Sequence, residues 1–369
     1  MSVPPLPPSP DRRTLVAGAV ATALTALLPR HPTAQEETTA ELEVTRSAPP
    51  GATGFVYSGD EHGASISAID LASGQVSTVP VPISPHNVQI TADGGWLLAV
   101  GEAAGGGHGG AGHGPNEAIG LLLVFETGRL SSGPVASIPV GTHPAHVVVD
   151  REGRRAFVTN SGDDTVSIVD LARKTVLRSV STGRYPHGLR INPNGGEAYV
   201  ANVEDGTVSV LDTLALVEVA RIPVGTAPVQ VGFTPDGERL YVSLRDENRV
   251  AVIDTRTREV LARIEVGRNP IQVHATPDGR YVYVANQGTE TDPDDTVSVI
   301  EVASGQVVDT IRTGTGAHGV AVSNDGSRVF VTNIADSTVS VIDTASRKVA
   351  ATIPVGKGPN GVTFQPGAG

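Results

Sequence analysis

The sequence predicts an all-β fold in which one short unit is repeated seven times, and two observations lead to this prediction. Segments of the kind seen at Glu197–Asn202, rich in valine and aromatic residues, recur with their last residues at 59, 101, 160, 202, 244, 286 and 333. Four of the six steps between them are 42 residues long, and the other two are 59 and 47. Strand-like segments repeated at about this period are typical of propeller blades. We therefore expect a seven-bladed β-propeller with four-stranded blades.

Each unit contains four short strand signals. The first, Glu197–Ala201, is followed by Thr207–Asp212, in which valines alternate with polar residues and so predict one buried face. Glu259–Val266 shows the third signal and Ile271–Thr276 the fourth. Pro277-Asp278-Gly279 then predicts a tight turn into the next unit, because proline presets φ and glycine supplies a positive φ.

The first strand of the unit ends in asparagine at four of its seven positions, which are Asn160, Asn202, Asn286 and Asn333. Asparagine side chains commonly bond their own backbone in turns. We therefore expect these asparagines to stabilise the turn that follows each strand.

The repeated segments, such as Tyr281-Val-Tyr-Val-Ala-Asn286 and Arg328-Val-Phe-Val-Thr-Asn333, resemble those of the YVTN-family propeller repeat proteins. The resemblance covers residues 54–366 and implies that the strand before each Pro-Asp-Gly turn is the innermost of its blade. The first unit, at Phe55–Ser58, then lacks an inner strand, and the last unit ends in Gly361–Pro366 with no successor. We expect these two ends to complete one blade together and to close the ring without a free sheet edge.

The N-terminal region predicts export. Two arginines, Arg12 and Arg13, precede the apolar run Leu15–Leu28, which is too short to span a bilayer comfortably. Small residues follow near Ala34, as in a secretion signal. We expect residues 1–34 to be a signal peptide, 35–53 a linker and 54–369 the propeller, and the mature protein to be periplasmic or extracellular.

The composition and the absence of known motifs exclude several classes of function. The formal net charge of −12 argues against general binding to a nucleic-acid backbone. The absence of cysteine excludes disulfides, thiolate metal sites and a cysteine nucleophile. No phosphate-binding loop and no nucleophile elbow occurs in a strand–helix context.

Histidines gather at the predicted starts of the inner strands. Aligning these starts places His86, His187 and His318 at the first position and His146 at the second, each on a different blade. Loops expected on the same face carry His62 and, in a glycine-rich insertion, His108 and His113. Imidazoles that converge on one axis suit zinc or copper. We expect metal affinity to fall as pH drops through the histidine range near 6.5.

Three interpretations of this face stay open at the level of sequence. The protein is a binding or scaffold protein whose top face takes a metal ion, a small ligand or a protein partner. Alternatively, the histidines are structural and bond to one another across the channel. The third interpretation is a propeller-type lactonase or lyase in which a channel histidine acts as general base, and a deep pocket with a carboxylate beside His86, His187 or His318 would favour it.

Overall fold

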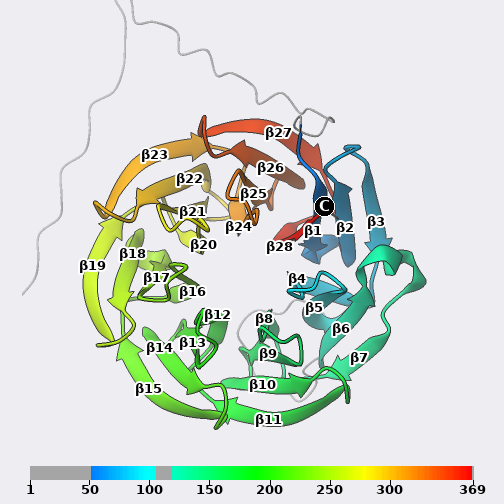
Figure 1. The fold of residues 1–369 in the computed structure, drawn as a ribbon, viewed down its shortest axis with the longest axis horizontal. Helices are drawn as coiled ribbons and strands as arrows, with labels where there is room; N and C mark the ends of the chain where they lie inside the picture. The colour runs from blue at the N-terminus through cyan, green and yellow to red at the C-terminus, as the bar shows by residue number, and fades with distance from the viewer. Residues whose placement is uncertain (1–50, 105–118, 368–369) are drawn as a thin grey trace, which may run out of the picture. The chain divides into compact units, whose positions relative to one another are not determined.

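The computed structural model describes residues 51–104 and 119–367. These residues form seven four-stranded antiparallel sheets arranged as blades around a central axis (Figure 1). The predicted seven-bladed β-propeller is confirmed. The predicted signal peptide, most of the linker, and His108 and His113 lie outside the described residues.

The strands run outward from the axis within each blade, and the inner strand comes first in the chain in every blade but one. The first two blades hold β28 (Pro359–Pro366), β1 (Gly54–Asp60), β2 (Ser65–Asp70), β3 (Val76–Pro80); and β4 (Ile83–Ile90), β5 (Trp96–Ala103), β6 (Gly120–Glu126), β7 (Ala136–Pro139). The third and fourth hold β8 (Pro144–Val149), β9 (Arg155–Asn160), β10 (Thr165–Asp170), β11 (Thr175–Ser181); and β12 (Pro186–Ile191), β13 (Glu197–Asn202), β14 (Thr207–Asp212), β15 (Val217–Pro223).

The remaining three blades repeat the same order. They hold β16 (Pro228–Phe233), β17 (Arg239–Leu244), β18 (Arg249–Asp254), β19 (Glu259–Glu265); β20 (Pro270–Ala275), β21 (Tyr281–Gly288), β22 (Pro293–Glu301), β23 (Gln306–Arg312); and β24 (Ala317–Val322), β25 (Arg328–Asn333), β26 (Thr338–Asp343), β27 (Lys348–Pro354). Three short 3-10 turns complete the described elements: η1 (Glu61–Gly63), η2 (Thr127–Ser132) and η3 (Arg245–Glu247). No helix among the described residues has both the length and the apolar character needed to cross a membrane.

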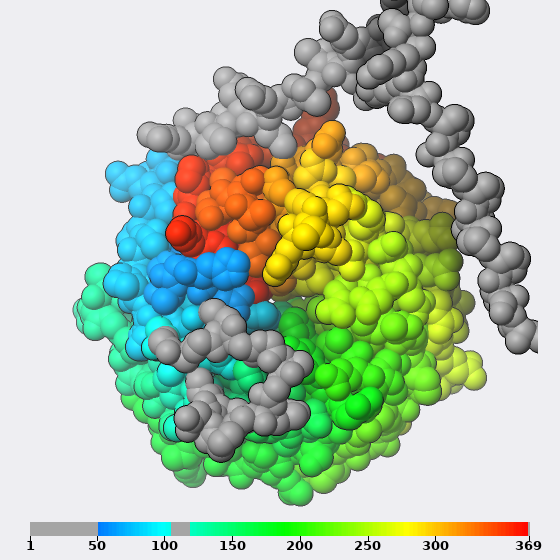
Figure 2. Space-filling view, turned by 180° about the vertical axis from the view of Figure 1, so that it is seen from behind, coloured from blue at the N-terminus to red at the C-terminus, as the bar shows by residue number. Residues whose placement is uncertain are grey.

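The first blade is completed by the two ends of the propeller, as the sequence predicts. β28 pairs antiparallel with β1, with Val56 opposite Phe364 and Ser58 opposite Val362. In the space-filling view the first blade, in blue, lies directly beside the last strands, in red (Figure 2). The ring therefore closes through backbone hydrogen bonds and needs no covalent link.

The hydrophobic core lies between blades. Each of the seven clusters of buried apolar side chains joins two neighbouring blades, so that every interface in the ring has its own core. The cluster beside the closing blade is built like the others and includes Val56, Phe330 and Val362. Each sheet packs on both of its neighbours, so the prediction of one buried face is wrong: in β14, Val208 and Val210 pack toward the next blade, Leu211 packs toward the preceding one, and Ser209 is buried as well.

The asparagines at the strand ends bond neighbouring strands and do not bond their own turns, which corrects the expectation from sequence. Asn333 donates from Nδ2 to the hydroxyls of Thr338 and Ser340 at 2.9 Å, and its Oδ1 accepts from the backbone N–H of Gly314 at 3.0 Å. Asn333 is completely buried. The alternating Thr-Val-Ser of the next strand places two hydroxyls on one face, within reach of a single amide.

Replacing Asn333 with alanine is expected to lower the free energy of unfolding by about 2–3 kcal/mol, because two buried hydroxyls and a backbone N–H lose their partner. Urea unfolding followed by circular dichroism measures the change. Asn324→Ala, at an exposed turn, is the matched control and should leave the midpoint unchanged. A midpoint for Asn333→Ala equal to that of the wild type would contradict a structural role for the repeated asparagine.

Candidate metal centre

The inner strands begin with a β-bulge that turns two successive side chains toward the axis. In β12, Pro186 pairs with Asn202 and Leu189 with Val200, so that His187 and Gly188 together face a single residue of β13. Corresponding register shifts occur at the start of the inner strand of every blade. A bulge re-aims side chains at the end of a strand. Residues at both aligned positions can therefore reach the same space.

Glycine at the second position allows the blades to approach each other. A Cβ on Gly361 would lie 2.7 Å from the Cα of Asn87 on the neighbouring inner strand. Only glycine fits where two backbones come this close. The bulge N–H is satisfied by a hydroxyl from the adjacent strand: His146 N donates to Thr159 Oγ1 at 2.9 Å, and that hydroxyl donates to the carbonyl of His187 at 2.6 Å.

Three of the predicted histidines come together at this mouth of the channel. His86, His146 and His187 belong to β4, β8 and β12, the inner strands of three consecutive blades. One ring nitrogen from each lies within 4.8 Å of the other two. The Nε2 atoms of His86 and His187 are 3.1 Å apart, and the ring centroids of His146 and His187 are 4.9 Å apart. We call these three residues the histidine cluster.

The Nδ1 atom of each ring is held by a different partner. His86 Nδ1 lies 3.0 Å from Glu61 Oε1, and His187 Nδ1 lies 3.2 Å from the carbonyl oxygen of Val229. His146 Nδ1 lies 3.3 Å from the side-chain nitrogen of Gln230. The oxygens of Glu61 and Val229 accept from Nδ1, as second-shell partners of metal-bound imidazoles do, whereas the amide nitrogen of Gln230 donates to His146 Nδ1. The ring planes are therefore set by residues of other blades: the adjacent blade for His86 and His187, and the next but one for His146.

Glu61 is the nearest carboxylate to the cluster, and sequence analysis did not single it out as a partner of His86. It stands in η1, whose Glu61 N–H donates to the carbonyl of Gly358 at 3.0 Å. Its second oxygen, Oε2, accepts from the amide of Asn360 at 2.6 Å. These bonds join β1, β4 and β28, so the closure of the ring also positions the carboxylate.

The histidines of the cluster have different protonation preferences. Burial alone would lower the pKa of His86, but the adjacent Glu61 carboxylate and, more weakly, Glu102 raise it above the usual value. Burial opposes ionisation of Glu61, yet its contacts with His86 and Asn360 hold the pKa of its carboxyl below the usual range. Burial and the neighbouring histidines lower the pKa of His146 and of His187 well below the ordinary value. At neutral pH the His146 and His187 rings are therefore uncharged, with the lone pair of His187 on Nε2 and that of His146 on Nδ1, where the Gln230 amide donates to it.

The remaining predicted residues occupy other places. His318, on β24, is buried but is not one of the three residues whose nitrogens converge, and burial lowers its pKa to about 4. Its Nδ1 has no hydrogen-bond partner among the described residues. His62 is exposed in η1, beside Gly358. His143, which was not among the predicted ligands, has its Nδ1 in contact with Glu102 Oε1.

A cavity of about 170 Å³ opens beside the cluster. Its lining includes Glu61, His86, Glu102, His143 and His187. A carboxylate therefore stands beside a channel histidine, as the lactonase or lyase interpretation requires. The space is smaller than most small-molecule sites.

Comparisons with known proteins agree on the fold. Residues 138–236 match a family described as YNCE-like beta-propeller, and residues 236–361 match the cytochrome D1 heme domain. The chain is thus a seven-bladed β-propeller of the type found in these families, while its likeness to YVTN-family repeats stays an interpretation of the sequence. Neither match includes His86. No curated protein sequence matches the chain.

Several solved structures resemble this one at low sequence identity. The hydrazine synthase of Kuenenia stuttgartiensis is 20% identical, with a TM-score of 0.66, over 78% of this chain and 96% of that one. A functionally unknown protein from Desulfotomaculum acetoxidans is 17% identical, with a TM-score of 0.70, over 86% and 100%. A putative 6-phosphogluconolactonase from Bacteroides uniformis is 16% identical, with a TM-score of 0.67, over 85% and 99%. Likeness at this level shows the fold alone.

Proposed function

We propose that this protein binds a divalent transition-metal ion through His86, His146 and His187. The observation that carries the proposal is the convergence of three imidazole nitrogens from three consecutive blades. A structural histidine needs one or two bonds to its surroundings, and these rings already have a partner at Nδ1. His86 and His187 also hydrogen-bond to each other through Nε2, but His146 Nε2 is buried without a partner among the described residues, and a metal ion at the point where the three rings converge would replace these contacts.

The spacing suits a small cation. A tetrahedral zinc site with bonds of 2.0–2.1 Å has ligand atoms about 3.3 Å apart. His86 Nε2 and His187 Nε2 are 3.1 Å apart, close to that value before any metal enters. Neutral imidazole ligands without thiolates favour zinc, copper or nickel over calcium or magnesium. Three protein ligands leave a fourth position open toward the cavity, for water or a small ligand.

The proposal also assigns the protein to an exported class of binding or scaffold proteins. It is supported by the arginine pair and apolar run that precede Ala34 in the sequence. An exported propeller with an open metal position would present the ion, or a ligand bound to it, at the channel mouth.

Changing Glu61 to glutamine tests the proposal through the residue that orients His86. The amide retains the shape of the side chain but removes its charge, so zinc affinity is expected to fall about 10- to 100-fold. Isothermal titration calorimetry with zinc chloride measures the change. Glu102→Gln is the matched control, because Glu102 pairs with His143, outside the cluster. This change should lower zinc affinity less than about threefold. Equal affinities for the wild type and Glu61→Gln would contradict the assigned role of Glu61.

Hydrolysis or elimination on a small lactone is a second candidate, favoured by the Glu61–His86–His187 chain of hydrogen bonds. Glu61 favours the protonated form of His86, and His187, with its depressed pKa, stands ready to accept a proton. Turnover of a lactone panel, followed by acid release, decides between the candidates. Activity that survives both His187→Ala and removal of metal by a chelator would exclude this site as its source.

A further inference from the structure

A second cavity lies at the opposite end of the inner strands from the histidine cluster. It has a volume of about 400 Å³, within the range of small-molecule sites. Its walls come from the last residues of β4, β8, β12, β20, β24 and β28. Much of the lining is apolar, including Ile90, Val149, Val320 and Phe364. Nothing in the histidine cluster takes part in this cavity.

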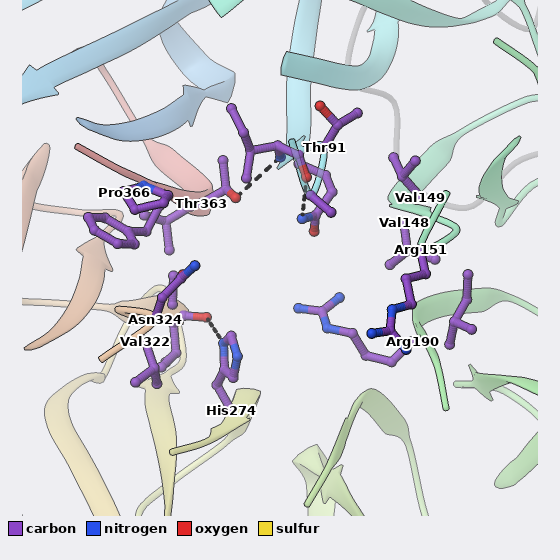
Figure 3. Close-up of a pocket in the computed structure, with 18 of the residues that line it drawn as sticks. Thr91, Val148, Val149, Arg151, Arg190, His274, Val322, Asn324, Thr363 and Pro366 are labelled. Atoms are coloured by element: carbon purple, nitrogen blue, oxygen red, sulfur yellow. Dashed lines mark hydrogen bonds between the residues drawn. The ribbon is translucent and has the colours of Figure 1, made fainter. Parts of the chain in front are cut away.

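Arg190 carries an unpaired positive charge into this cavity. Figure 3 shows its side chain extending from the β12 wall into the open space. Its one hydrogen bond is from Nη1 to the carbonyl of Leu189, at 2.9 Å, and no carboxylate of the described residues forms an ion pair with it. Burial alone lowers its pKa to about 10, which leaves it charged at neutral pH.

The other charges at the cavity do not neutralise Arg190. Asp150 is the only lining carboxylate of the described residues, and it is already engaged by Arg155 Nε at 3.0 Å and by the backbone N–H of Arg154 and Arg155. Arg151, at the rim, adds a second, exposed cation. A desolvated cation without a counter-ion is costly to stability. In a chain with a net charge of −12, such a site suits an anion supplied from outside.

His274 faces the same space from β20 (Figure 3). Its Nδ1 lies 3.3 Å from the carbonyl oxygen of Val320, and a ring nitrogen that faces a carbonyl carries the proton. Burial and, next, Arg190 lower its pKa to about 4, so the ring is neutral. Its Nε2 is then an acceptor and has no partner among the described residues.

We propose that this cavity binds a small hydroxycarboxylate, with its carboxylate paired to the Arg190 guanidinium and its hydroxyl group donating to His274 Nε2. A guanidinium pairs with a carboxylate through two parallel hydrogen bonds. One half-buried guanidinium, with only the exposed Arg151 at the rim beside it, matches a singly charged carboxylate better than a dianionic phosphate. The neutral acceptor on His274 selects a ligand with a hydroxyl donor, and the apolar walls receive its hydrocarbon part.

Three matched probes test the proposal: mandelate has both groups, phenylacetate lacks the hydroxyl, and mandelamide lacks the charge. Isothermal titration calorimetry with the wild-type protein is expected to show mandelate binding at least about tenfold more tightly than either of the others. Equal binding of mandelate and mandelamide, or no millimolar binding of mandelate, would overturn the proposal.

Variants assign the two contacts. Arg190→Met is expected to weaken mandelate binding at least about tenfold, and Arg151→Gln, at the rim, less than about threefold. In the His274→Phe protein, the affinity for mandelate should fall to that of the wild type for phenylacetate. The affinity for phenylacetate should not change. Arg190→Met should melt no lower than the wild type, because it removes a half-buried charge that has no ion-pair partner among the described residues. Unchanged mandelate affinity in a folded Arg190→Met protein would contradict the assignment.

This site is independent of the proposed metal centre. A protein with His86, His146 and His187 changed to alanine is expected to retain mandelate binding. Loss of mandelate binding in that folded variant would show that the ligand sits at the histidine cluster, and would overturn the second site.

Discussion

Deletion of residues 360–369 is expected to abolish the cooperative unfolding transition of the whole propeller. The deletion removes almost all of β28, the inner strand of the first blade, and leaves β1 as an unpaired edge. It also removes Val362 and Phe364 from the core that joins the first and last blades. Each blade packs only on its two neighbours. Opening the interface between the first and last blades therefore exposes an apolar face on each of them. The expected loss is comparable to the entire free energy of unfolding, roughly 5–15 kcal/mol.

Thermal unfolding followed by circular dichroism measures this loss, and two variant proteins serve as controls. Deletion of residues 368 and 369 leaves all of β28 in place and should melt as the wild type does. A permuted chain that carries residues 356–367 ahead of residue 51, through a short glycine-serine linker, should recover the cooperative transition. An unchanged melting temperature after deletion of residues 360–369 would contradict closure of the ring through β28.

The repeat made the fold predictable from the sequence. Alternating valines, as at Thr207–Asp212, indicated strands but not that both of their faces are buried between blades, and the Pro-Asp-Gly turns specify where one blade ends. The pairing of the two chain ends followed from counting strands, and the structure confirms it in the register of β1 with β28. The partners of the repeated asparagines were not predictable, because they depend on which face of the adjacent strand carries the hydroxyls.

The site was predictable only in part. Sequence alignment placed His86 and His187 at equivalent positions, but the convergence of His146 depends on the β-bulge, which no residue type announces. Glu61 comes from a turn after a different strand, so its contact with His86 depends on the curvature of the ring. Blade order separates His318 from the cluster, since β28 and its Asn360 stand between β24 and β4.

The same alignment of the inner strands contains residues that indicate the second cavity. Three residues after the first inner-strand position stand Gln89, Val148, Arg190, Gly232, His274, Ala321 and Thr363. An arginine at a position that faces a narrow channel is conspicuous once the inner strands are aligned. Taken alone, Arg190 resembles an ordinary surface charge on a strand.

Metal binding is expected to depend on pH through His86. Its pKa is raised by Glu61, whereas those of His146 and His187 are depressed, so His86 is the first of the three to gain a proton as pH falls. Protons compete with the metal for the same nitrogen. Affinity should therefore be highest above the pKa of His86 and should decline as the solution is acidified through it.

Variants of the other histidines test whether metal binding depends on the histidine cluster alone. His318→Ala removes a buried histidine outside the cluster, and His62→Ala removes an exposed one. Both should retain metal binding close to that of the wild type. A His108→Ala/His113→Ala protein tests the glycine-rich insertion: loss of binding in this variant alone would move the site to the loop.

The most direct test of the account is calorimetric titration of zinc, and separately copper, into the wild type and into the His86→Ala/His146→Ala/His187→Ala protein. The wild type is expected to bind one ion per chain with a dissociation constant below micromolar. The affinity of the triple variant for the metal should be at least about a hundredfold lower, because all three ligands are removed. Circular dichroism confirms that the variant is folded. Equal affinity of the two proteins, or wild-type binding no tighter than micromolar, would contradict the metal centre.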